Sequence, residues 1–126
     1  MNKPSKKKLY TNYQRGANFE RRVKEHFEDE LVKLAPRDIK WYVLRSAGSR
    51  GSIDVLVVLT NTRTRHQRVL GIQCKLEKPS YQSMQKFITE VHFSTGIECF
   101  YAYRGVKRTI EIYPSLEVSK LLEVKL

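Results

Sequence analysis

Two apolar runs separated by a polar stretch constrain the fold of this chain more than any other feature. Residues 53–59 form an almost unbroken run of β-branched and aliphatic side chains, and residues 69–76 form a second one after the polar segment 60–67. Runs of this length and composition are typical of strands, and a short polar connection between two of them favours a hairpin. The sequence therefore predicts a β-hairpin at the centre of the fold.

Three polar residues interrupt these runs. Asp54 lies at the start of the first run, and Gln73 and Lys75 lie two apart near the end of the second, so that strand alternation places both on one face. A buried charge costs several kcal/mol unless it is paired or binds a metal. One explanation is an ion pair between Asp54 and Lys75. The other is a divalent-metal site of the kind that cuts phosphodiester bonds.

The pattern Ile53-Asp54 followed by Gln73-Cys74-Lys75 resembles the signature of PD-(D/E)XK nucleases. Two further motifs, RGANFER at residues 15–21 and RSAGS at residues 45–49, are similar to motifs of the archaeal type of Holliday junction resolvase, including versions carried by archaeal viruses. The resemblance spans about residues 15–117 and extends to the expected order of elements. A lone D…QxK match is weak, and the combination with RSAGS and an upstream Glu20 is far more specific.

Hydrophobic periodicity predicts the remaining elements. A helix is expected over residues 13–34, with an apolar face that comprises Phe19, Val23, Phe27, Leu31 and Leu34. The other expected elements are a strand at 40–45, a helix from about 80 to 94, strands at 98–103 and 109–113, and a short helix or tail. The helix from about 80 to 94 has Met84, Phe87, Ile88 and Val91 on one face. Residues 1–12 are expected to be a flexible basic arm, and residues 13–126 a single nuclease domain. The fold class is α/β. The resemblance implies a restriction-endonuclease-like fold with a central mixed five-stranded sheet flanked by helices.

The charge of the chain points to a polyanionic partner. The formal net charge is +11 and the isoelectric point about 9.8, which favours nucleic acid over an anionic membrane as the partner. No apolar run approaches the ~20 residues that span a bilayer, and no secretory signal follows the basic N-terminus. The expected location is the cytoplasm of an archaeal cell, or of the host if the source is viral. Cys74 and Cys99 lie in apolar strand patterns and are expected to be reduced core thiols.

The resemblance implies a metal-dependent DNA endonuclease that resolves four-way (Holliday) junctions by paired symmetric nicks, as a homodimer, with Mg²⁺ or substituting Mn²⁺ and no small-molecule cofactor. The catalytic residues would be Glu20, Asp54, Gln73 and Lys75, with Lys75 positioning the attacking water. Asp54, Gln73, Glu20 and the Cys74 backbone carbonyl would be the metal ligands. DNA contacts would come from Arg15, Arg21, Arg45, Ser46, Ser49, Arg50, Arg63 and Arg65.

Simpler interpretations stay open at this point. Glu20 lies among basic residues and could only neutralise them along the helix. The Gly- and Ser-rich segment 46–52 could be a plain loop rather than a phosphate-binding one. Gln73 departs from the family pattern, in which an acid is usual, and this keeps a catalytically weak or inactive junction-binding module as an alternative. A nuclease that acts on linear duplex DNA is a third possibility.

Overall fold

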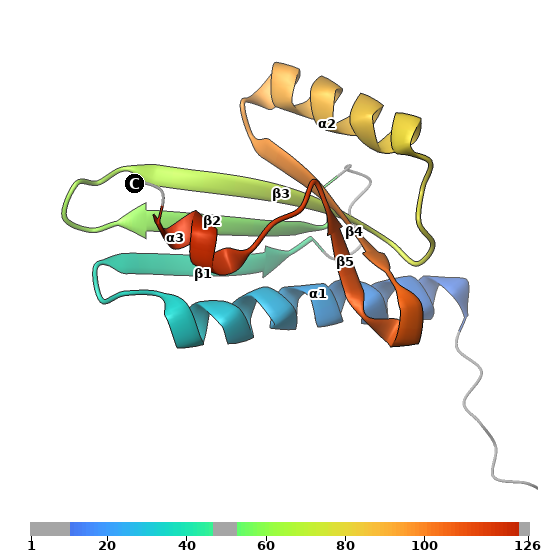
Figure 1. Ribbon diagram of the computed structural model, residues 1–126, viewed down its shortest axis with the longest axis horizontal. Coiled ribbons are helices and arrows are strands. Elements are labelled where there is room, and N and C mark those ends of the chain that lie inside the picture. Colours follow the sequence, from blue (N-terminus) through green and yellow to red (C-terminus); the bar gives the residue numbers. More distant parts are fainter. Residues whose placement is uncertain (1–10, 47–52, 124–126) are drawn as a thin grey trace, which may run out of the picture.

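The computed structural model describes residues 11–46 and 53–123 and has an α/β architecture, in which helices flank a five-stranded mixed sheet (Figure 1). The elements are α1 (Asn12–Leu34), β1 (Ile39–Arg45), β2 (Val55–Asn61), β3 (Gln67–Lys75), α2 (Tyr81–Thr95), β4 (Glu98–Arg104), η1 (Val106–Arg108), β5 (Ile110–Tyr113) and α3 (Val118–Glu123). The strands lie side by side in chain order, and only the β3–β4 pair is parallel. Among the described residues, no helix is long and apolar enough to cross a membrane.

Helix α1 covers one face of the sheet. It begins with a capping box in which Thr11 and Gln14 satisfy each other's backbone amides, so Thr11 and Asn12 belong to the helix rather than to the expected arm. The predicted apolar face is buried along most of its length, from Phe19 to Leu31. Leu34 is an exception, because its side chain is 43% exposed at the last residue of the helix. The prediction that Leu34 belongs to the core face was therefore wrong.

The predicted hairpin is present as the antiparallel pair of β2 and β3. Val55, Val57 and Leu59 are fully buried, while the residues between them are partly exposed, as expected for a strand with one face on the core. The last pair of this ladder joins Val55 to Ile72. Strand β2 therefore begins one residue after Asp54, so this carboxylate lies where β2 and β3 separate.

Helix α2 lies on the side of the sheet opposite α1 and packs on β4 (Figure 1). Its Phe87 ring meets the Tyr101 ring of β4 edge to face, with centroids 5.0 Å apart. Gln73 of β3 pairs in register with Tyr101, and Lys75 pairs with Tyr103. Since neighbouring residues in register project to the same face, Gln73 and Lys75 lie on the α2 side of the sheet. Cys74, between them, faces α1.

Candidate active site

A cleft of about 200 Å³ opens between the N-terminal half of α1 and the ends of β1 and β2. It is lined by Asn12, Tyr13, Gly16, Ala17, Glu20, Arg45, Ser46 and Asp54. Four of these residues, Glu20, Arg45, Ser46 and Asp54, are predicted site residues, and they come from three separate segments of the chain. The fold therefore gathers them into one place.

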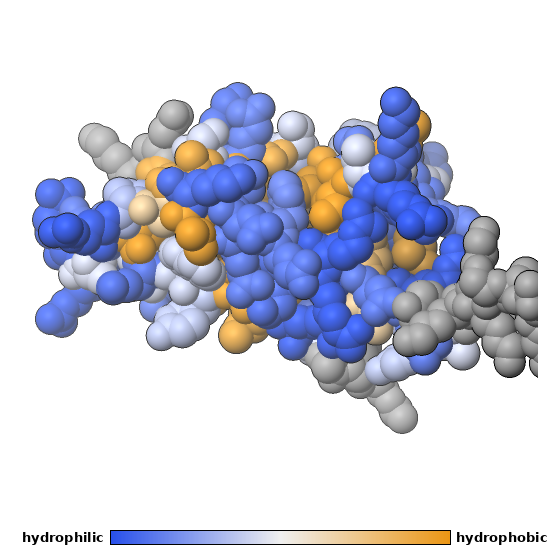
Figure 2. Space-filling view, turned by 90° about the horizontal axis from the view of Figure 1, so that it is seen from below, coloured by the Kyte–Doolittle hydropathy of each residue, from blue (hydrophilic) through white to orange (hydrophobic). Residues whose placement is uncertain are grey.

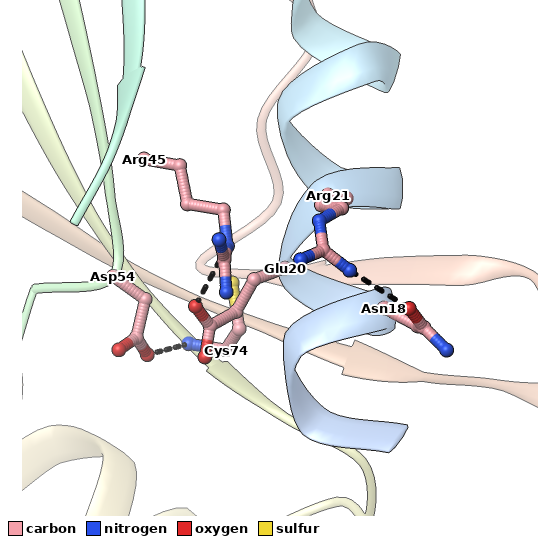
Figure 3. Close-up of polar contacts among 6 residues, drawn as sticks. All are labelled: Asn18, Glu20, Arg21, Arg45, Asp54 and Cys74. Carbon is pink, nitrogen blue, oxygen red and sulfur yellow. Dashed lines mark hydrogen bonds and ion pairs between the residues drawn. The ribbon is translucent and has the colours of Figure 1, made fainter. Parts of the chain in front are cut away.

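Asp54 is fixed by both neighbouring strands. Its amide donates to the Ile72 carbonyl at 2.9 Å, and its carbonyl accepts from the Ser46 amide at 2.9 Å. Its Oδ2 accepts a hydrogen bond from the Cys74 amide at 2.8 Å (Figure 3). No ion pair joins Asp54 to Lys75 in the described part of the chain, so the expected alternative of a direct pair is not observed. The carboxylate is positioned by backbone instead.

Glu20 points from α1 toward the sheet and contacts Arg45 at the end of β1. Arg45 Nε donates to Glu20 Oε1 at 3.2 Å, and their side chains are only 14% and 21% exposed (Figure 3). The neighbouring helix bases do not take this role, because Arg21 donates to Asn18 instead. Glu20 is therefore a half-buried acid facing the cleft, rather than a surface acid that neutralises its own helix.

Burial disfavours the ionised form of both acids. Burial is the main cause that raises the pKa of Asp54, and the Cys74 amide, Lys75 and Arg45 offset it only in part. Burial, and then the negative charge of Asp54, raise the pKa of Glu20 despite the Arg45 guanidinium. Both charges also contribute, after burial, to a raised pKa of the Cys74 thiol. Burial thus makes the carboxylate charges in the cleft costly, and a bound cation would relieve this cost.

Gln73 and Cys74 offer further oxygens at the point where β2 and β3 separate. Gln73 Oε1 is buried and has no hydrogen-bond partner among the described residues. A buried polar atom without a partner is costly and calls for an explanation such as an ion or water. The Cys74 amide points toward Asp54, and the carbonyl of a strand residue points to the same side as its amide. That carbonyl lies beyond the last β2–β3 pair at Val55 and Ile72.

These donors fit a hard divalent cation. Mg²⁺ prefers oxygen ligands and usually takes only one or two carboxylates from a protein. Glu20 and Asp54 supply two carboxylates, Gln73 an amide oxygen without a partner, and Cys74 a backbone carbonyl. Within residues 11–46 and 53–123 no cluster of three or more His, Cys, Asp or Glu side chains could hold a metal. The candidate set therefore depends on the amide and the carbonyl for its remaining ligands.

The predicted DNA-contact residues are spread over the surface, and only Arg45 and Ser46 line the cleft. Arg15 is exposed on the first turns of α1, and Arg63 and Arg65 are exposed in the turn between β2 and β3. Ser49 and Arg50 lie outside the described residues. Sequence reasoning missed the pairing of Arg45 with Glu20, for which the only signal is a basic residue at the end of a strand.

Replacing Asp54 with asparagine should stabilise the metal-free protein. Because the pKa of Asp54 is raised in the folded state, its ionised form destabilises the fold at neutral pH, and an amide oxygen can still accept from Cys74. We expect the melting temperature in EDTA at pH 7 to rise by a few degrees, since about 1 kcal/mol corresponds to roughly 2–8 °C for small domains. The gain should shrink as pH falls through the raised pKa and vanish below the usual value of 3.8.

The matched control for this measurement is Asp38→Asn, which removes an exposed carboxylate just before β1 and should leave the melting temperature unchanged. A loss of stability in Asp54→Asn at pH 7 would mean that the Asp54 charge holds the fold together, as an ion pair would.

Comparison with known proteins adds no family assignment, because no family model matches the chain and no curated protein matches it significantly.

Proposed function

We propose that this protein is a metal-dependent endonuclease that cuts DNA at four-way junctions. The observation that carries the proposal is the meeting of Glu20 and Asp54 in one cleft, where burial raises the pKa of each. Cys74, whose amide holds Asp54, directly follows Gln73, which has a buried amide oxygen without a partner among the described residues. This set matches the positions implied by the resemblance to archaeal-type Holliday junction resolvases and PD-(D/E)XK nucleases. The net charge of +11 supports a DNA substrate.

The roles of the residues follow from their chemistry. Asp54, Glu20, Gln73 and the Cys74 carbonyl would hold Mg²⁺, which supplies a water of lowered pKa and neutralises charge on the phosphate. Lys75 lies exposed on the α2 side of the sheet, two residues after Gln73, and would orient the attacking water through its ammonium group. The water oxygen attacks phosphorus and loses a proton to solvent, the bond from phosphorus to one sugar oxygen breaks, and that oxygen takes up a proton from solvent.

Arg45 has two successive partners in this proposal. In the free protein its guanidinium is the counter-ion of Glu20. When Glu20 serves as a metal ligand, the Arg45 guanidinium would be free to donate strong charge-assisted hydrogen bonds to a phosphate oxygen.

A homodimer suits a substrate with two symmetry-related strands. Support comes from exposed apolar side chains on the α2 side of the sheet. Phe93 near the end of α2 is 90% exposed, and Tyr42 and Leu44 of β1 are more than half exposed. Tyr42 and Leu44 alternate with Val43, which is buried on the α1 side, so they lie on the face that α2 leaves open. A second subunit would cover these residues.

The second candidate function is junction binding without efficient cleavage. The observations that favour it are the neutral Gln73, where the resembled family carries an acid, and the neutralisation of Glu20 by Arg45. Both features weaken the attraction of the site for a dication.

A labelled four-way junction separates the two functions. With Mg²⁺ the enzyme should produce paired, symmetry-related nicks, whereas a binding module should give only a shifted complex. A linear duplex of the same sequence in competition tests junction selectivity, and equal cutting of both substrates would favour a duplex nuclease. A titration of Mg²⁺ and Mn²⁺ is needed because the site carries only two carboxylates. The nuclease proposal fails if no nick forms at any metal concentration while the junction still binds.

A further inference from the structure

A strained basic turn between β4 and β5 lies outside the candidate cleft. Lys107 and Arg108 are both exposed, and their φ angles are 57° and 60°, a left-handed conformation that residues with side chains rarely adopt. The amide of Gly105 donates to the Thr109 carbonyl at 2.7 Å, which closes the turn. Strained conformations of this kind often mark functional positions. The turn presents two cations in succession at a fixed place.

A hydrogen bond connects this turn to the N-terminal half of α1. Arg22 Nη2 donates to the Arg108 carbonyl at 2.5 Å, which joins residues from opposite ends of the sequence. Arg22, Lys107 and Arg108 form what we call the α1–turn cluster. Within the described residues no ion pair neutralises any of the three. The nearby acid Glu111 instead accepts a hydrogen bond from the Thr109 hydroxyl, at 3.4 Å.

Bases gather in the N-terminal half of α1, which includes Arg22, and acids gather in the C-terminal half. The half that includes Glu20 also carries the bases Arg15, Arg21, Arg22 and Lys24, with no other acid. The other half carries the acids Glu25, Glu28, Asp29 and Glu30 and the single base Lys33. Figure 2 views the molecule from the α1 side and shows hydrophilic residues over most of that face. A polyanion is therefore attracted to the end near the cleft and repelled from the other end.

We propose that the α1–turn cluster is a second contact surface for DNA, which holds the phosphates of a duplex arm next to the cleft. This inference rests on the proposed function for the identity of the polyanion. The turn follows β4, whose Tyr103 pairs in register with Lys75 of β3, so the turn lies at the same end of the sheet as the candidate site. Each DNA strand carries a phosphate every ~3.4 Å of duplex axis, so phosphates close to one in the cleft come within reach of the cluster. Contacts to phosphates alone recognise the arm without reading its sequence.

The test replaces both turn cations without disturbing the turn. Asparagine tolerates the left-handed conformation, so Lys107→Asn combined with Arg108→Asn removes two charges at little backbone cost. Binding to a labelled four-way junction is measured in EDTA over a range of salt concentrations. We expect affinity to fall roughly ten- to hundredfold near 0.1 M salt, and the slope of log affinity against log salt to become shallower by about 1.8, because two phosphate contacts are lost.

The matched control removes the same charge from another place. Lys33→Gln combined with Lys120→Gln acts on exposed lysines of the acidic half of α1 and of α3, and should change affinity by less than about twofold. Exchanging the two turn residues, Lys107→Arg with Arg108→Lys, keeps the charge and should retain affinity. Equal losses in the turn variant and the control would overturn the proposal, since net charge alone would then explain binding. No loss in the turn variant would also overturn it, since the turn would then not contact the DNA.

Binding in EDTA does not depend on cleavage, so the two proposals fail separately. If the wild type never nicks the junction but the turn variant binds it weakly, the nuclease is refuted and the contact surface stands. If the wild type nicks the junction and the turn variant binds it normally, only the contact surface is refuted.

Discussion

Asp54→Asn and Lys75→Ala should each reduce junction cleavage by at least about a thousandfold, because removal of a group that acts together with others in the reaction typically costs this much or more. Asparagine keeps the hydrogen bond from the Cys74 amide but removes a charge from the proposed metal site. Alanine at position 75 removes the ammonium group that we propose orients the attacking water. Single-turnover cleavage at saturating protein is the measurement. Junction affinity should stay within a few fold, since it depends on many dispersed Lys and Arg contacts.

Two control variants match these changes. Asp38→Asn and Lys40→Ala remove an exposed acid and an exposed base near the start of β1, and both should cleave like the wild type. Loss of junction binding in both Asp54→Asn and Lys75→Ala would contradict the prediction and give the two residues a structural role. Together with a higher melting temperature for Asp54→Asn, retained binding without cleavage identifies an acid kept for function at a cost in stability.

Gln73→Glu should lower the Mg²⁺ concentration that half-saturates cleavage. The Gln73 Oε1 atom is buried without a partner, and a carboxylate of nearly the same shape adds a negative charge at that place. At an effective dielectric of about 20 the added attraction for a dication is on the order of a few kcal/mol, before desolvation reduces it. A shift of the midpoint of roughly tenfold or more is therefore expected. The maximum rate can fall at the same time if the bound water becomes less acidic.

The measurement pairs a cleavage titration with Mn²⁺ binding in the absence of DNA, so that metal affinity is read independently of the reaction. Gln82→Glu makes the same change on the exposed surface of α2 and should leave both midpoints in place. If the midpoint for Gln73→Glu does not move either, Gln73 is not a ligand and another acid must complete the site. The candidates are Glu20 and Glu77, an exposed residue two positions after Lys75. If neither the wild type nor the variant cuts at any metal concentration, the junction-binding module becomes the better interpretation.

Local periodicity was sufficient to predict most elements. The spacing of Phe19, Val23, Phe27 and Leu31 predicted the buried face of α1, because it repeats with the period of a helix. The two apolar runs on either side of a polar stretch predicted the hairpin. The error at Leu34 arose because periodicity does not show where a helix extends past the sheet. The five strands were likewise predicted from runs of β-branched and aromatic residues.

The candidate site could be predicted only in part, because its residues are brought together by contacts between distant segments. The sequence by itself determined that Asp54, Gln73 and Lys75 interrupt apolar strands and that the chain is strongly basic. Tertiary structure decided that Asp54 accepts from the Cys74 amide rather than pairing with Lys75, and that Arg45 pairs with Glu20. It also placed Arg22 against the turn at Arg108. Sequence patterns report the period of one element, whereas these partners depend on how α1, β1 and β3 pack together.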